Sequence, residues 1–128
     1  ESELLGEFLK RFVKDTKYSY HKVLNMSFGK RVVDSLPNLM DNGLNVIVYN
    51  FVDMLSHART EMEMIRELAD DEAAYRSLTV SWFEHSPLYE MIRYLGDKDV
   101  NLLITTDHGS IRVDNPVQII GDKMTNTN

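Results

Sequence analysis

The stretch LNVIVYNF, residues 44–51, decides the fold class. It is almost continuously apolar and rich in β-branched residues, which is typical of a strand covered on both faces. A second run with this character, NLLITTD, occupies residues 101–107. Helical patterns precede the first run and separate the two. The order of elements therefore predicts an α/β layered fold, a parallel sheet flanked by helices, in which Val46–Phe51 and Leu102–Thr106 are parallel.

The helices are predicted from apolar residues that recur at three- and four-residue steps. Pro37 is expected to bend or restart the second helix and Gly43 to end it, whereas Ser86 and Pro87 have the residue types of an N-cap and a first helical position. A loop or single turn is expected directly after residue 51, and a weak pattern with a turn at 16–30. The predicted helical segments are 4–13, 30–43, 60–71, 71–86 and 86–99.

The composition is that of an ordinary soluble globular protein. The chain has 128 residues, of which 43% are hydrophobic and 27% charged, a length that suits one domain. We therefore expect residues 1–128 to form a single unit. No apolar run approaches the ~20 residues of a membrane helix, and the first residues lack the blocks of a signal peptide. These features predict a cytoplasmic protein with no membrane partner.

Charge and cysteine content restrict the ligands. The net charge of −6 argues against duplex nucleic acid as a partner, because binding to a phosphate backbone is driven by lysine and arginine. The chain has no cysteine, so any metal must be held by histidine, carboxylate or water.

Two acid–histidine pairs follow the two predicted strands. Asp53 and His57 are four residues apart, so a single helical turn would direct both side chains the same way. Asp107 and His108 follow the second strand, and Gly109 lets the chain turn away. In open parallel sheets, ligands gather at the carboxyl ends of the strands. Two carboxylates and two imidazoles there suit zinc or manganese, and a pair of such ions can hold a phosphoryl group.

Each pair also has a structural interpretation, because Asp107 could cap a turn and His57 could bond to the backbone. The agreement of the two pairs in residue type and strand position favours the metal site. His85 is interpreted as a surface or capping histidine. Arg59 could meet a substrate phosphate, but an ion pair with Glu63 is the preferred interpretation.

Three segments, YNFVDMLSHAR, SWFEHSPLYEMIRYL and LLITTDHGSIRV, resemble the PglZ domain of the alkaline phosphatase superfamily, and most closely that of PorX-type two-component response regulators from Bacteroidetes. The resemblance implies an alkaline-phosphatase-like fold of which this chain is the C-terminal part. It implies that Asp53 and His57 bind one zinc and that Asp107 and His108 bind the other. The implied activity is a phosphodiesterase or phosphohydrolase acting on nucleotide-like substrates.

The resemblance also implies partners. These are the missing N-terminal half of the PglZ domain, a receiver domain, and a sensor kinase and sigma factor in regulation of type IX secretion. In the superfamily the first half supplies another metal-binding aspartate and the nucleophile, and a further histidine normally follows the Asp-His-Gly segment. Here no histidine follows His108, and no nucleophile is evident before Val46. We therefore expect the chain alone to be inactive and, with apolar surface exposed, to form a homodimer. The alternative is a non-catalytic interaction or dimerisation module of a response regulator.

Overall fold

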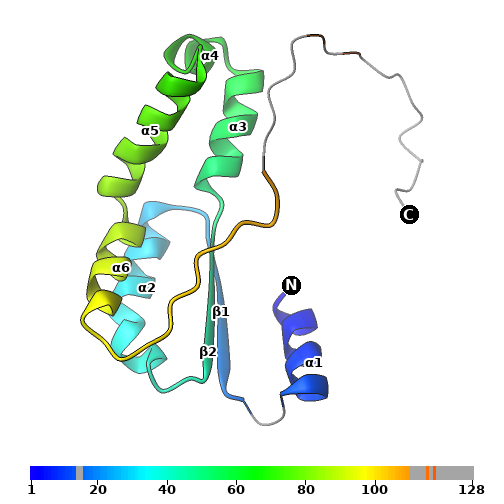
Figure 1. Cartoon of the computed structure of the whole chain (residues 1–128), viewed down its shortest axis with the longest axis vertical. Coiled ribbons are helices and arrows are strands. Elements are labelled where there is room, and N and C mark those ends of the chain that lie inside the picture. Colours follow the sequence, from blue (N-terminus) through cyan, green and yellow to red (C-terminus); the bar gives the residue numbers. More distant parts are fainter. Residues whose placement is uncertain (14–15, 110–114, 116, 118–128) are drawn as a thin grey trace.

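A computed structural model of the chain describes residues 1–13, 16–109, 115 and 117 (Figure 1). The described residues form a mixed α/β structure in which helices flank a parallel sheet, as the sequence predicts. In chain order the elements are α1 (Ser2–Phe12), β1 (Tyr18–Val23), α2 (Met26–Leu39), β2 (Leu44–Tyr49), α3 (Phe51–Glu61), α4 (Glu63–Leu68), α5 (Glu72–Glu84) and α6 (Pro87–Gly96).

The sheet consists of β1 and β2, paired in parallel from Tyr18 opposite Leu44 to Val23 opposite Tyr49. The strand predicted from LNVIVYNF is confirmed as β2. The second predicted strand, Leu102–Thr106, is wrong: this segment has no strand structure, and β2 pairs with β1.

The run Leu102–Thr106 has no regular secondary structure and lies exposed. The exposed fractions are 51% for Leu102, 86% for Leu103 and 71% for Ile104. An apolar, β-branched run shows that a segment is suited to a buried strand, but it does not specify which backbone will pair with it. In the described part of the chain no strand does so.

Helix α2 begins earlier than its apolar pattern predicts. The side chain of Asn25 accepts a hydrogen bond of 2.9 Å from the amide of Phe28, so this residue caps the helix and the first turn forms there. Pro37 lies inside the helix, which ends at Leu39. Gly43 therefore does not end the helix. The amide of Gly43 donates to the Lys17 carbonyl at 2.8 Å, and β2 begins at the next residue.

The core lies on the side of the sheet that α2 and α6 cover (Figure 1). Gly29 of α2 allows the closest approach, because a Cβ atom there would lie 3.0 Å from Pro87 of α6 and 3.3 Å from Val23 of β1. The N-cap predicted at Ser86 is confirmed. The buried apolar side chains of the described residues are Leu9, Val23, Val32, Leu36, Ala69, Pro87 and Met91.

The opposite face of the sheet meets α1. This helix is confirmed, and Leu9 is buried, but most of its apolar side chains point away from the sheet. Phe8 and Phe12 are more than half exposed, with ring centroids 4.7 Å apart. This face is therefore covered only in part.

Helices α3, α4 and α5 form an arm that extends beyond the sheet (Figure 1), and none of them has a fully buried residue. Phe51–Glu61 is helical where a loop or single turn was predicted, so the arm begins directly after β2. Among the described helices, none has the length and apolar character needed to cross a membrane.

Candidate metal centre

The first turn of α3 is anchored by an aromatic stack. Phe51, the first residue of the helix, lies parallel to Trp82 of α5 with centroids 4.1 Å apart, and Tyr49 meets the same indole edge-on at 6.1 Å. The Trp82 indole is therefore used in aromatic packing between β2, α3 and α5. The hydroxyl of Tyr75 further ties the two helices, since it bonds to Ser56 at 2.7 Å. The helix that carries the first acid–histidine pair is therefore held in place.

Asp53 and His57 lie on the exposed side of α3. Oδ1 of Asp53 is 3.6 Å from Nε2 of His57, one helical turn away. Two ligands of one tetrahedral zinc, each about 2.0–2.1 Å from the ion, lie roughly 3.4 Å apart. The observed separation is close to that value, so the carboxylate and the imidazole fit a shared cation with only a small adjustment.

Asp107 and His108 form a second local pair, with Oδ1 and Nε2 3.8 Å apart. The Nδ1 atom of His108 lies 3.2 Å from the carbonyl oxygen of Gly109. A carbonyl can only accept, so Nδ1 carries the proton of this hydrogen bond, and in the neutral imidazole Nε2 keeps the free lone pair. The hydroxyl of Thr106 donates to the His108 carbonyl at 2.6 Å. The local geometry thus leaves Nε2 free to bind a metal.

The structure brings the residues together within each pair. Among the residues described, no group of three or more histidine, aspartate and glutamate side chains is arranged to hold one ion. Each pair supplies two ligands, and a four-coordinate shell needs two more from water or from other residues. That the pair Asp53 and His57 and the pair Asp107 and His108 together form one two-metal site stays a prediction.

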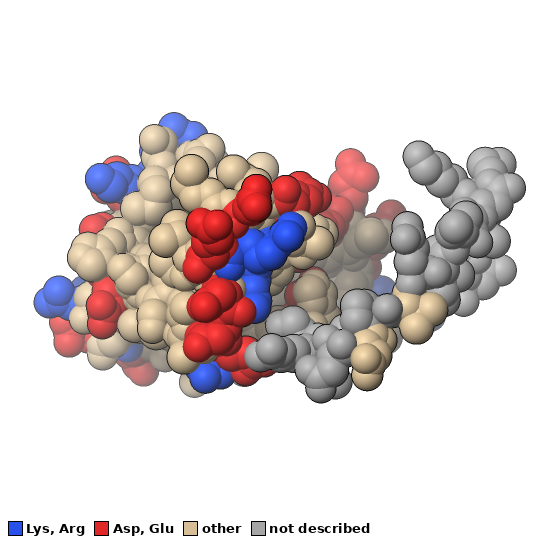
Figure 2. Space-filling view, turned by 90° about the horizontal axis from the view of Figure 1, so that it is seen from above, with Lys and Arg blue, Asp and Glu red and all other residues tan. Residues whose placement is uncertain are grey.

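The arm is strongly acidic. Residues 51–85 contain eight aspartates and glutamates against three arginines. Viewed from above, the acidic side chains form a band across the molecule, with a basic group enclosed at its centre (Figure 2). Such a field raises the local concentration of cations and opposes a free phosphate anion.

The arginines of the arm are engaged in local contacts. Arg59 donates to the Asp70 carbonyl at 3.2 Å and lies over the Tyr75 ring, so the predicted ion pair with Glu63 is wrong. The carbonyl of Asp70, in the turn before α5, competes with Glu63 for the Arg59 guanidinium. The spacing of residues in the sequence does not reveal this contact. Arg76 instead pairs with Glu72 at 3.2 Å.

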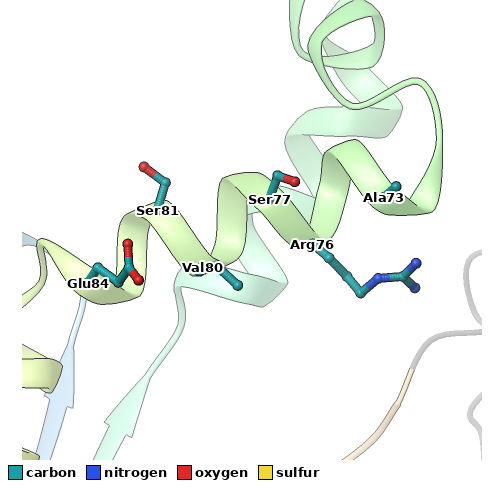
Figure 3. Close-up of a pocket in the computed structure, with 6 residues that line it drawn as sticks. All are labelled: Ala73, Arg76, Ser77, Val80, Ser81 and Glu84. Carbon is teal, nitrogen blue, oxygen red and sulfur yellow. The ribbon is translucent and has the colours of Figure 1, made fainter.

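Two other features lie outside the acid–histidine pairs. His85 is exposed at the end of α5 and its Nδ1 bonds to the Ser81 carbonyl at 2.8 Å, which confirms the capping interpretation. A shallow hollow on the outer face of α5 is lined by one helix alone and contains none of the four predicted ligands (Figure 3). Its lining residues are Ala73, Arg76, Ser77, Val80, Ser81 and Glu84.

The family described as the BREX system PglZ alkaline phosphatase-like domain matches residues 2–128. No curated protein matches the sequence significantly. The two parallel strands with flanking helices are consistent with part of an alkaline-phosphatase-like domain, which is a phosphoesterase-type domain. The chain belongs to the PglZ family of alkaline phosphatase-like domains.

Proposed function

We propose that the chain is the metal-binding part of a two-zinc phosphodiesterase or phosphohydrolase. In this proposal Asp53 and His57 hold one zinc, and Asp107 and His108 hold the other, with manganese as the alternative metal. One observation carries the proposal: a carboxylate and an imidazole lie 3.6 Å apart directly after β2 in a chain of the PglZ family. Zinc bound there would polarise a phosphoryl group and stabilise the charge that develops during its transfer.

The residues of this chain prepare the site in two ways. Hydrogen bonding of Nδ1 to the Gly109 carbonyl sets the tautomer of the neutral His108 imidazole, so that Nε2 is the nitrogen available as a ligand. The acidic arm favours cation binding, so a phosphate substrate would be attracted only where metal compensates the negative charge. Substrate binding should therefore depend on metal binding.

The finer assignments follow from the sequence resemblance. We propose a nucleotide-like substrate, a parent response regulator with a receiver domain, and a role in type IX secretion involving a sensor kinase and a sigma factor. The nucleophile and the remaining ligands would come from the N-terminal half of the domain. The chain by itself would bind metal weakly and lack activity.

The first test is zinc binding by the chain. Isothermal titration with zinc should show binding that becomes at least about ten-fold weaker in the double variant Asp53→Asn, His57→Gln, because both ligands on α3 are removed. The matched control is Glu84→Gln, His85→Gln, which removes an adjacent acid and imidazole from α5. Zinc affinity in the control should equal that of the unsubstituted chain.

An equal loss of zinc affinity in both double variants would show that zinc binds non-specifically to acidic and imidazole side chains. Unchanged zinc affinity in both variants would show that α3 holds no ion. Either result contradicts the proposed site. If the same substitutions in the parent protein left both its zinc content and its phosphodiesterase activity unchanged, the non-catalytic interaction module would be the better account.

A further inference from the structure

Helix α3 begins without a side-chain cap. Within the part of the chain that the structure describes, the side chain of Asn50, at the N-cap position, makes no capping hydrogen bond, whereas α2, α5 and α6 each have one. An uncapped first turn opens readily, because its amides lack partners. Asp53 and His57 are neighbours only while the turn between them is helical. The separation of these two side chains therefore depends on other contacts to that turn.

Tyr75 of α5 contacts the turn from outside. Its hydroxyl lies 2.7 Å from Oγ of Ser56 and 3.2 Å from the carbonyl oxygen of Val52, and Oγ of Ser56 lies 3.0 Å from the same carbonyl. Whichever of the two hydroxyls donates to the other, the chain of hydrogen bonds ends on the Val52 carbonyl, since a carbonyl can only accept. Val52 and Ser56 directly precede Asp53 and His57 in the sequence. Tyr75 thus holds α3 one residue before each proposed ligand.

Tyr75 is itself held in position. It lies in the first turn of α5, where the side chain of Asp71 accepts a hydrogen bond of 2.7 Å from the amide of Ala74 and caps the helix. The guanidinium of Arg59 lies over the Tyr75 ring, 5.6 Å from its centroid, so a movement of the ring away from α3 would lose this cation–π contact. A capped helix therefore supports the uncapped turn of its neighbour.

We propose that Tyr75 is a positioning residue for the metal pair Asp53 and His57. Its hydroxyl keeps the turn that bears the two ligands helical, so that the carboxylate and the imidazole lie 3.6 Å apart before an ion binds. A pair that is already arranged loses less conformational freedom on binding and binds more tightly. The stack of Phe51 on Trp82 cannot replace the hydroxyl, because it fixes the start of α3 and not the turn that follows. The inference rests on the proposed function, since it assigns a role in zinc binding.

Tyr75→Phe removes the hydroxyl and keeps the ring under Arg59. Isothermal titration should show zinc binding about three- to ten-fold weaker than in the unsubstituted chain, as expected if the turn is helical for only about a tenth to a third of the time. This loss is smaller than the roughly 10–100-fold typical of partners that bond directly to a metal ligand. The matched control is Tyr89→Phe in α6, the same change at an exposed tyrosine whose hydroxyl has no hydrogen-bond partner among the described residues. Zinc affinity in the control should be unchanged.

A measurement without metal tests the turn itself. The amides of residues 54–57 should exchange with solvent at least about three times faster in Tyr75→Phe than in Tyr89→Phe, because the turn opens more often. The amides of α2 should exchange at the same rate in both variants. Faster exchange throughout the chain would show that Tyr75 serves general stability, and would overturn the positioning role.

The metal titrations separate this inference from the proposed function. Absence of zinc binding by the unsubstituted chain would reject both. Equal zinc affinity in the unsubstituted chain and in Tyr75→Phe would reject the role of Tyr75 alone. At saturating cobalt in place of zinc, the visible absorption spectra of these two proteins should coincide, because the ligands are the same. Different spectra would show that Tyr75 alters or joins the ligand set, and would overturn a positioning role.

Discussion

Single residues set how closely the elements of this protein approach. Gly29 is the clearest case, because a side chain there would contact Pro87 and Val23 at 3.0–3.3 Å. The residue lies within α2, where glycine would otherwise be unfavourable relative to alanine by about 1 kcal/mol. Its presence is explained by the contact with α6 and not by the needs of the helix.

We therefore predict that Gly29→Ala lowers the free energy of unfolding by about 1–2 kcal/mol. Overpacking costs about 1–3 kcal/mol, and the better helix propensity of alanine offsets only part of it. Urea denaturation followed by circular dichroism measures the change. The matched control is Gly96→Ala in α6, where no atom lies within 4 Å of the added Cβ, and which should be neutral or stabilising. Equal destabilisation by both substitutions would contradict the packing role of Gly29.

Tyr49 is the residue whose ionisation should affect stability. Burial raises the pKa of its phenol to about 12, and the Glu90 carboxylate adds to the shift. The ordinary value is 10.0, so the folded state holds this proton over a pH range in which the unfolded chain releases it. The stabilising contribution is complete below pH 10 and is lost as the pH rises towards 12.

The Tyr49→Phe variant isolates this effect. Between pH 9 and 11 the unfolding midpoint of the unsubstituted protein in urea should fall more steeply than that of the variant. The difference between the two proteins in the pH-dependent loss of unfolding free energy should be about 1 kcal/mol or less. The phenol is only half-buried, and solvent screens its interactions. Near pH 7 the variant should be as stable as the unsubstituted protein or slightly more so, since the buried hydroxyl has no hydrogen-bond partner among the described residues. If the stability of the two proteins depended on pH in the same way, the raised pKa of Tyr49 would be refuted.

At the scale of elements, the junction between α5 and α6 is held by the side chain of a single residue, Ser86. Ser86 is almost fully buried, its hydroxyl donates to the Phe83 carbonyl at 2.8 Å, and its oxygen accepts from the Tyr89 amide. The same side chain thus ends one helix and begins the next. Pro87, at the first position of α6, needs no amide partner there.

Ser86→Ala should lower the free energy of unfolding by about 1–2 kcal/mol, because it removes the cap and leaves the Phe83 carbonyl without this donor. Thermal unfolding is a sufficient measurement. Ser77→Ala changes the same residue type at an exposed position within α5, where the side chain has no hydrogen-bond partner among the described residues, and should change stability by less than about 0.5 kcal/mol. A loss of similar size in Ser77→Ala would show that the cap is not the cause.

For the whole molecule, the important feature is the amount of apolar surface left uncovered. Leu4, Phe8 and Phe12 follow one another at four-residue steps on α1 and are all more than half exposed. The methionines of the arm, Met54, Met62 and Met64, are also exposed rather than filling the core. Exposed apolar side chains that are contiguous favour association with another surface.

We predict that the chain self-associates and that Phe8→Gln weakens this association, because Phe8 is the central one of the three exposed apolar side chains on α1. Sedimentation velocity over a range of concentrations should show a dissociation constant at least about ten-fold higher in the variant. Glu3→Gln changes a nearby exposed residue of α1 without removing apolar area and serves as the control. A concentration-independent monomer in the unsubstituted protein would reject the predicted dimer.

The sequence was sufficient to predict features that depend on a few neighbouring residues. The strand β2, the amphipathic α1, the cap at Ser86 and the closeness of Asp53 to His57 all follow from local spacing, because periodicity and capping act within one or two turns. The α/β class follows from the order of these elements. The sequence resemblance also predicts the PglZ family, which the match over residues 2–128 confirms.

Only the tertiary structure decided which segments meet. β1 alternates aromatic and polar residues and has little apolar continuity, so its pairing with β2 depends on contacts between segments far apart in the chain. Leu102–Thr106 has the stronger strand pattern and is nevertheless exposed. Arg59 bonds to a carbonyl brought near by the fold. Long-range pairing depends on the entropy of loop closure and on the surfaces available, and neither can be read from the local composition of a segment.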